Sequence, residues 1–374
     1  MMTIKLSSPF KRLIYGFGAV IATTAVVSPS QSARAQTTAY IVTDLSADDA
    51  TQVPYKLNNL GDLVGRARST VRGQPRATLW NHSTLVKKHL GVLRGGDYSS
   101  ATGINDAGEV TGVSNTGTVI IPFLWTSKEG LRRVPLLSGD SCGQATSINK
   151  YGHVVGYSSG QNGTKAFFWP RSGGLRRLVT LPGGDCSKAH DLNDRDEIVG
   201  TSASFAGERA VLWTKTGSVR DLGTLPGDYV SVAVAINNNG DVVGYSKGPR
   251  GMRAYLWDKV AGMQELGVLP GGDSSRALAI SDFGEVVGSS TSASGDHAFI
   301  WTKQAGMVDL NNASSVDLGV VLFEAHSINE KGQIIAMGAS TREGSTGDMP
   351  GSAGHEECAP APSGTFLLTP TPAR

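Results

Sequence analysis

Short apolar segments alternate with glycine-rich turns along residues 40–370, and this alternation predicts an all-β protein. The clearest unit spans residues 262–302. It predicts one strand that ends near Leu266 and three more over residues 277–280, 285–288 and 297–302. Glycine, proline, asparagine or aspartate bounds each segment, as turns require. Apolar stripes with helical spacing are scarce, so we expect no layer of helices.

An Asn-x-x-Gly turn joins the second and third of these strands in most units. Examples begin at Asn105, Asn149 and Asn237. Asparagine can hydrogen-bond the backbone two residues on, and glycine supplies the positive φ that a short hairpin loop needs. The recurrence of the turn predicts that these residues are architectural.

The tryptophans reveal the length of the repeat. They stand at Trp80, Trp125, Trp169, Trp213, Trp257 and Trp301, with successive gaps of 45, 44, 44, 44 and 44 residues. A glycine precedes each one at Gly65, Gly112, Gly156, Gly200, Gly244 and Gly288, and a seventh copy is expected at Gly338. Four strands in about 44 residues is the size of a propeller blade. The competing parallel β-helix usually has rungs about half this long.

Seven copies of the unit predict a seven-bladed β-propeller closed by its own termini. The turn series is Asn58, Asn105, Asn149, Asn193, Asn237, Ser281 and Asn329. The chain begins with the last strand of a repeat, residues 41–45, and ends with the third, residues 366–369, in which Leu368 stands at the tryptophan position. We expect the two ends to complete one blade, because ring closure protects sheet edges.

The first 35 residues differ from the repeats and predict a secretory signal peptide. Lys5, Lys11 and Arg12 precede an apolar run over residues 13–27, and residues 33–35 read Ala-Arg-Ala, a cleavage motif. A membrane anchor is the alternative, but the run is shorter than the ~20 residues that a span needs. Cleavage would leave the propeller as residues 36–374, with no membrane span and with 30 basic against 32 acidic residues. That balance gives no reason to expect nucleic-acid binding.

These motifs resemble those of the HAF family of bacterial extracellular repeat proteins, named for a His-Ala-Phe tripeptide. His297-Ala298-Phe299 matches the tripeptide literally, and variants stand at residues 76–78, 165–167, 209–211 and 253–255. The flanking Ala-x-x-Ile-Asn-x-x-Gly-x-Val-Val-Gly and Leu-Gly-x-Leu-Pro-Gly-Gly elements match as well. The resemblance covers about residues 40–370. It implies bacterial export and a repeat architecture, and it implies no activity.

Variable positions of the repeat are the candidates for binding residues. Two positions flank the recurring alanine of the expected inner strand, and their polar members are Gln144, Lys188, His190, Arg276, Glu324 and His326. If that strand lines the channel, these side chains would gather near one mouth and suit a small polar ligand or a glycan. Ordinary variation of solvated positions is the alternative interpretation.

Other motifs favour structural roles. Two Gly-x-Ser-x-Gly matches, around Ser158 and Ser246, occupy the same repeat position and lack the strand-turn-helix context of hydrolases. Turn aspartates such as Asp273 offer one carboxylate per loop, too few for calcium. An irregular segment, residues 341–365, contains His355-Glu356-Glu357-Cys358, for which a surface loop is favoured over a metal site. Cys142 and Cys186 lie one repeat apart, and we expect no disulfide between them.

The sequence therefore predicts a secreted or periplasmic monomer that binds a protein or glycan, without a cofactor, a metal or evident catalysis. The first alternative is an extracellular polysaccharide hydrolase or lyase with its site at the channel mouth. For that chemistry only Glu324, His190 and His326 qualify. The second alternative is a structural component of the cell surface or matrix.

Overall fold

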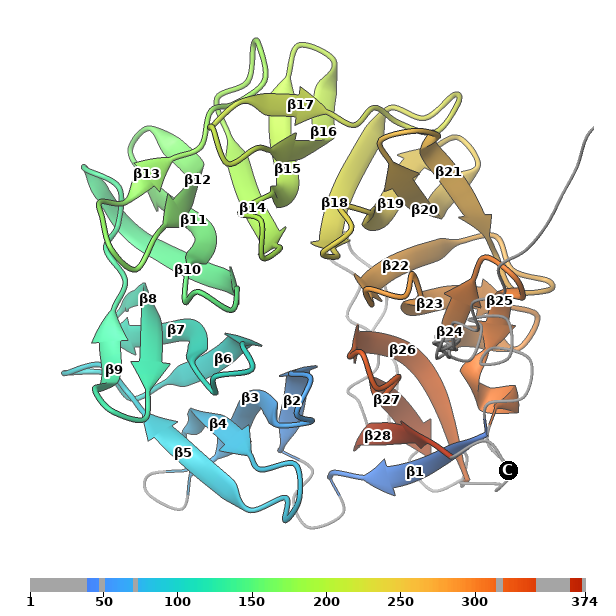
Figure 1. Ribbon diagram of the computed structural model, residues 1–374, viewed down its shortest axis with the longest axis horizontal. Helices are drawn as coiled ribbons and strands as arrows, with labels where there is room; N and C mark the ends of the chain where they lie inside the picture. The colour runs from blue at the N-terminus through green and yellow to red at the C-terminus, as the bar shows by residue number, and fades with distance from the viewer. Residues whose placement is uncertain (1–38, 47–50, 70–72, 314–318, 341–363, 372–374) are drawn as a thin grey trace, which may run out of the picture.

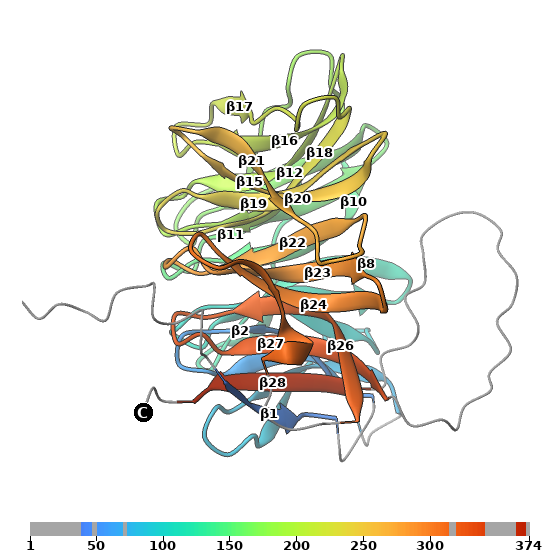
Figure 2. The same cartoon turned by 90° about the vertical axis from the view of Figure 1, so that its right-hand side faces the viewer.

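Seven four-stranded antiparallel sheets stand around a central axis in the computed structural model, which describes residues 39–46, 51–69, 73–313, 319–340 and 364–371. Figure 1 looks down this axis, and Figure 2 shows the ring from its side. The protein is a seven-bladed β-propeller, as the repeat predicted. The expected signal peptide and nearly all of the irregular segment lie outside the described residues.

Each blade contributes its strands in the same radial order. The innermost strands are β2 (Val53–Leu57), β6 (Ser99–Ile104), β10 (Asp140–Ile148), β14 (Ser187–Leu192), β18 (Val230–Ile236), β22 (Ser275–Ile280) and β26 (Val320–Ile328). The second strands are β3 (Leu63–Arg68), β7 (Val110–Thr116), β11 (Val154–Gly160), β15 (Ile198–Ser204), β19 (Val242–Gly248), β23 (Val286–Ser292) and β27 (Ile334–Ser340).

The outer half of each blade follows the same scheme. The third strands are β4 (Pro75–Trp80), β8 (Val119–Thr126), β12 (Gly163–Trp169), β16 (Gly207–Trp213), β20 (Gly251–Asp258), β24 (Gly295–Thr302) and β28 (Gly364–Pro370). The outermost are β5 (Lys87–Gly91), β9 (Gly130–Arg133), β13 (Arg176–Arg177), β17 (Val219–Asp221), β21 (Gly262–Gly267), β25 (Gly306–Asp309) and β1 (Tyr40–Asp44). A short 3-10 turn, η2 (Leu310–Asn312), follows β25.

The two ends of the chain complete the seventh blade together. β1 pairs antiparallel with β28, from Tyr40 opposite Pro370 to Asp44 opposite Phe366. Leu368 lies opposite Ile334 in the same register that places Trp301 opposite Val286. The predicted closure and the predicted role of Leu368 are therefore confirmed.

The recurring glycine of the second strand is required by a bulge in the inner strand. At Gly288 an added Cβ would lie 2.0 Å from the backbone oxygen of Arg276, and the register of β22 shifts between Ala277 and Ala279. The seventh copy differs from the prediction, because Ala336 rather than Gly338 pairs with the inner-strand alanine, Ala325. The second strand is also longer than predicted: β23 continues to Ser292, since polar residues after the glycine still pair with β24.

Apolar side chains fill the interfaces between blades, because each sheet buries both of its faces. The described residues form seven buried clusters, and each joins two neighbouring blades. Trp213, for example, is fully buried against residues of β11 and β12 in the preceding blade, such as Val155 and Phe168. Burial of one valine, leucine, isoleucine or phenylalanine side chain contributes roughly 1.5–3 kcal/mol, so the packing between blades stabilises the ring.

Candidate functional site

In six of the seven blades the turn after the inner strand is held by its asparagine, and Ser281 takes this place in the sixth blade. In the turn after β6, Asn105 Oδ1 accepts hydrogen bonds from the backbone N–H groups of Ala107 (3.1 Å) and Glu109 (3.0 Å). Its Nδ2 donates to the carbonyl of Asn149 in the next blade at 3.0 Å. One side chain thus closes its own turn and joins two blades.

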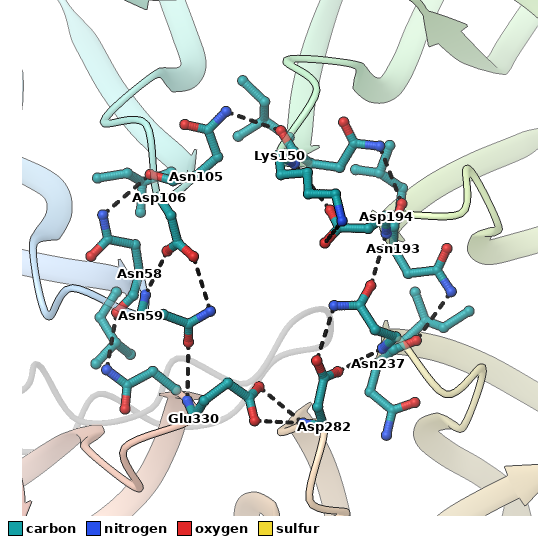
Figure 3. A pocket seen from close by; sticks show the side chains of 18 of the residues that line it. Asn58, Asn59, Asn105, Asp106, Lys150, Asn193, Asp194, Asn237, Asp282 and Glu330 are labelled. Atoms are coloured by element: carbon teal, nitrogen blue, oxygen red, sulfur yellow. Dashed lines mark hydrogen bonds and ion pairs between the residues drawn. The ribbon is translucent and has the colours of Figure 1, made fainter.

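Repetition of this contact creates a ring of hydrogen bonds around the channel, which Figure 3 shows in part. Six amides donate to the carbonyl of the next turn at 3.0–3.2 Å: Asn58 to Asn105, Asn105 to Asn149, Asn149 to Asn193, Asn193 to Asn237, Asn237 to Ser281, and Asn329 to Asn58. Ser281 has no amide to donate, so the ring is interrupted between the sixth and seventh blades.

A second ring is formed by the residue that follows each asparagine. Its backbone N–H donates to the side-chain oxygen of the equivalent residue in the next blade, as from Asn238 to Asp282 at 2.7 Å and from Glu330 to Asn59 at 3.0 Å. Lys150 offers no acceptor oxygen, which interrupts this ring after Asp106. The Lys150 ammonium instead lies 3.4 Å from Asp194 Oδ2.

These turns surround a cavity of about 190 Å³ at one mouth of the channel. A girdle of aliphatic side chains forms part of its lining: Leu57, Ile104, Ile148, Leu192, Ile236, Ile280 and Ile328. Its rim carries the carboxyls of Asp106, Asp194, Asp282 and Glu330 beside Lys150. Burial, and then the nearby carboxylates, raise the pKa of Glu330 to about 7, although the N–H of Asp282 opposes this shift.

A second cavity of about 190 Å³ lies on the other side of the girdle, inside the channel. Polar side chains line it, among them Lys56, Thr102, Ser147, Asp191 and Ser327. Ser147 donates to Asp191 Oδ1 at 2.6 Å, and Asp191 Oδ2 accepts from the N–H of Ile236 at 3.1 Å. The girdle therefore separates two polar compartments.

The six predicted binding residues lie on the inner strands, three or five residues before the first residue of the turn, and so toward the mouth opposite the asparagine turns. We call this end the variable mouth. Gln144 and Lys188 meet there through Tyr157, a residue that the sequence analysis did not select. The Tyr157 hydroxyl donates to Gln144 Oε1 at 2.7 Å, and the Lys188 ammonium lies 5.4 Å from the centre of the Tyr157 ring.

Arg276, Glu324 and His326 form a second group at the variable mouth. The Arg276 guanidinium lies 3.2 Å from Glu324 Oε2, and His326 Nε2 lies 3.2 Å from Glu324 Oε1. His326 Nε2 is also 2.8 Å from Met337 Sδ. Burial lowers the pKa of His326 more than the Glu324 carboxylate raises it.

His190 does not join either group. Its Nδ1 lies 2.8 Å from the carbonyl of Ala233 in the next blade and must donate to it, since a carbonyl only accepts. Thr102 and Thr146 donate to Ala145 and Ala189 in the same way, at 2.8 and 3.0 Å. Burial lowers the pKa of His190, which favours the neutral ring. His190 therefore joins two blades. Of the three residues that could serve a hydrolase or lyase, only Glu324 and His326 remain.

Tyrosines are the functional candidates that sequence reasoning missed. Tyr157 and Tyr245 both follow the recurring glycine of a second strand, and Tyr55 lies on β2 with the Arg66 guanidinium 5.9 Å from its ring centre. All three are half-buried. Their aromatic side chains at varying repeat positions were the available signal, and the cross-strand pairing of Gln144 with Tyr157 places Tyr157 beside a predicted binding residue.

The motifs judged structural from the sequence make structural contacts. Ser158 and Ser246 are buried and accept from the N–H groups of Leu137 and Leu225, at 3.3 and 3.1 Å. Cys142 and Cys186 are both free thiols, the first half-buried and the second exposed. Within the described residues no cluster of three or more histidine, cysteine or acidic side chains is arranged to hold a metal. The same residues include no helix long and apolar enough to cross a membrane.

No family model and no curated protein sequence matches this chain. Its fold is similar to that of a streptogramin B lyase, with a TM-score of 0.55 and 11% identity over 89% of this chain and 98% of the other. The fold is also similar to that of virginiamycin B lyase from Staphylococcus aureus, with a TM-score of 0.54 and 12% identity over 89% of this chain and 99% of the other. For the β-propeller domain of the trilobed protease from Pyrococcus furiosus the TM-score is 0.51 and the identity 11%, over 81% of this chain and 90% of the other. At these identities the likeness establishes the fold alone.

Proposed function

We propose that this chain is an exported binding scaffold that recognises a glycan at the variable mouth. The observation that carries the proposal is the group formed by Gln144, Tyr157 and Lys188, which joins an amide, an aromatic ring and an ammonium across two blades. The leader pattern of residues 1–35 and the resemblance to HAF proteins support export.

The chemistry of this mouth suits a sugar better than a strongly charged polymer. A sugar ring has an apolar C–H face that can stack on tyrosine, and hydroxyls that both donate and accept. Gln144 offers both hydrogen-bonding roles, while Lys188 and Arg276 donate and Glu324 accepts. Because both signs of charge are present, a polyanion or a polycation would meet repulsion as well as attraction.

The opposite mouth is less available to a ligand. Its asparagine amides and most of its carboxylate oxygens already bond a neighbouring blade, as the Asn105 amide does with the next blade and the Asp282 carboxylate with the preceding one. A ligand there would have to compete with contacts that hold the ring together. We therefore assign binding to the variable mouth.

A glycan array probed with purified residues 36–374 tests this function. We expect retention of a glycan whose affinity falls about tenfold, or about 1.4 kcal/mol, in Tyr157→Ala and in Gln144→Ala. Tyr151→Ala is the matched control, because Tyr151 is an exposed tyrosine in an asparagine turn at the opposite mouth. Equal losses in Tyr151→Ala, or no retained glycan, would overturn the assignment. Shortened glycan chains after incubation would instead favour the hydrolase or lyase alternative through Glu324 and His326.

A further inference from the structure

In the sixth blade, away from the channel, a serine contacts a histidine and the histidine contacts an aspartate. Ser294 is exposed on the two-residue hairpin between β23 and β24, His297 lies on β24, and Asp309 ends β25. Ser294 Oγ is 3.3 Å from His297 Nε2, and His297 Nδ1 is 2.6 Å from Asp309 Oδ2. The His297 and Asp309 side chains are only 12% and 15% exposed, so their pairing is sheltered from water.

The hydrogen bonds assign the proton on the imidazole. An ionised carboxylate only accepts, so Nδ1 of His297 carries the hydrogen that it donates to Asp309. In the neutral ring Nε2 is then a bare acceptor that faces the hydroxyl of Ser294. Asp309 is itself held in place, because its Oδ1 accepts from both the backbone N–H and the side-chain amide of Asn311, each at 2.9 Å.

A structural role accounts for part of this arrangement only. In the fifth blade Arg253 occupies the position of His297, and its Nε lies 3.2 Å from Glu265 Oε1, so an ion pair at this place also serves the ring. That precedent explains His297 with Asp309, but it does not explain why a serine faces His297 Nε2, although the Ser294 hydroxyl also lies 3.2 Å from Ser292 Oγ. The equivalent hairpin of the fourth blade carries Ala206 at the position of Ser294.

We propose that Ser294 is a nucleophile activated by His297 and Asp309, and that it attacks esters. The Oγ–carbon bond forms as the hydroxyl proton moves to His297 Nε2. The carbon–oxygen bond to the leaving alcohol then breaks, and the alcohol departs with that proton. Water next attacks the acylated serine, giving one proton to His297 and releasing the acid, and Ser294 regains its proton from the imidazole.

The position of Ser294 defines the class of substrate. Because the hairpin is exposed, the ester must be reactive, or be carried on a large molecule that reaches the surface of the ring. This activity goes beyond glycan binding and does not depend on it. General-base assistance of this kind typically contributes about 10²–10⁴-fold in rate.

A fluorophosphonate probe on the intact mature chain tests the proposal. Its P–F bond breaks as the O–P bond to serine forms, and peptide mass spectrometry locates the label. We expect Ser294 to be labelled about 10²-fold faster than in His297→Gln. Asp309→Asn should also slow labelling, since it removes the carboxylate that fixes the tautomer. Ser294→Ala, which changes only an exposed hairpin residue, should abolish both the label and the release of p-nitrophenol from p-nitrophenyl acetate.

Ala206→Ser provides the matched control. It puts a serine at the same hairpin position of the fourth blade, where Arg209 replaces His297. We expect no enhanced labelling there. Thermal melting of each variant separates loss of reactivity from loss of fold. Labelling of Ser294 at the rate of the serine at position 206, or at an unchanged rate in a folded His297→Gln, would overturn the proposal.

Discussion

The turn asparagines combine two roles that are separate in most loops. Asn193 accepts from the N–H groups of Arg195 and Glu197, each at 3.0 Å, and donates to Asn237 of the next blade at 3.1 Å. Aspartate could accept but not donate, and serine is too short to reach the next blade. This dual demand explains at the residue scale why asparagine recurs after the inner strands.

The interrupted link at Ser281 leads to a stability prediction. Ser281→Asn should add the missing bond to the carbonyl of Asn329 and raise the free energy of unfolding by about 1 kcal/mol. The site can accept the larger side chain, because Asn105 and Asn193 sit beside Glu109 and Glu197 as Ser281 sits beside Glu285. Urea unfolding measures the effect. Ser281→Ala is the control and should destabilise; a destabilised Ser281→Asn would contradict the proposed continuity of the ring.

The raised pKa of Glu330, at the same mouth, predicts that the stability of the folded protein depends on pH. Its pKa of about 7 in the folded protein lies above the ordinary value of 4.5. Folding therefore takes up a proton between these values, and the stability due to this group falls as the pH rises from about 4.5 to about 7. Glu330→Gln should remove that loss and unfold at a higher urea concentration than the parent at pH 8, with little difference at pH 4. The same difference at both pH values would contradict the raised pKa.

At the scale of elements, the strand β1 matters more than its five residues suggest. It covers the edge of β28, and Tyr40 at its start belongs to the cluster between the sixth and seventh blades. The other blades obtain their outermost strand from the same repeat. In the seventh blade this strand comes from the opposite end of the chain.

Removal of residues 36–46 should lower the free energy of unfolding by several kcal/mol. The deletion exposes the edge of β28 and returns the buried side chain of Tyr40 to water, at a cost of roughly 1.5–3 kcal/mol for one such side chain. Thermal or urea unfolding measures the change. A chain that lacks only residues 36–38, which precede β1, is the control. An unchanged transition after the longer deletion would count against closure by the two termini.

At the scale of the whole molecule, the channel has two chemically different ends. The asparagine turns and their carboxyl rim form one end, and the side chains of the variable mouth lie toward the other. The aliphatic girdle of Leu57, Ile104, Ile148, Leu192, Ile236, Ile280 and Ile328 lies between them. Regular positions of the repeat build the girdle and the turns, while variable positions build the other mouth. The contacts that close the ring can therefore stay the same while the residues of the variable mouth change.

The sequence by itself determined the blade, the number of blades and the closure by the termini. These features depend on the spacing of tryptophans, on turn chemistry and on the offset of the first strand, all of which are local patterns. It also identified Gln144 and Lys188 as polar variants on the inner strands, and Arg276 and Glu324 likewise.

Only the tertiary structure decided which of these side chains meet. Arg276 and Glu324 are 48 residues apart and become neighbours because adjacent blades are packed side by side. The seventh copy of the recurring glycine was expected at Gly338, but the strand register places Ala336 opposite the inner-strand alanine, Ala325. His190 contacts the carbonyl of Ala233 rather than the other predicted binding residues, because the register of its own strand sets the direction of its side chain. A repeat length specifies which residues are equivalent, but contacts between blades also require the register and geometry of the closed ring.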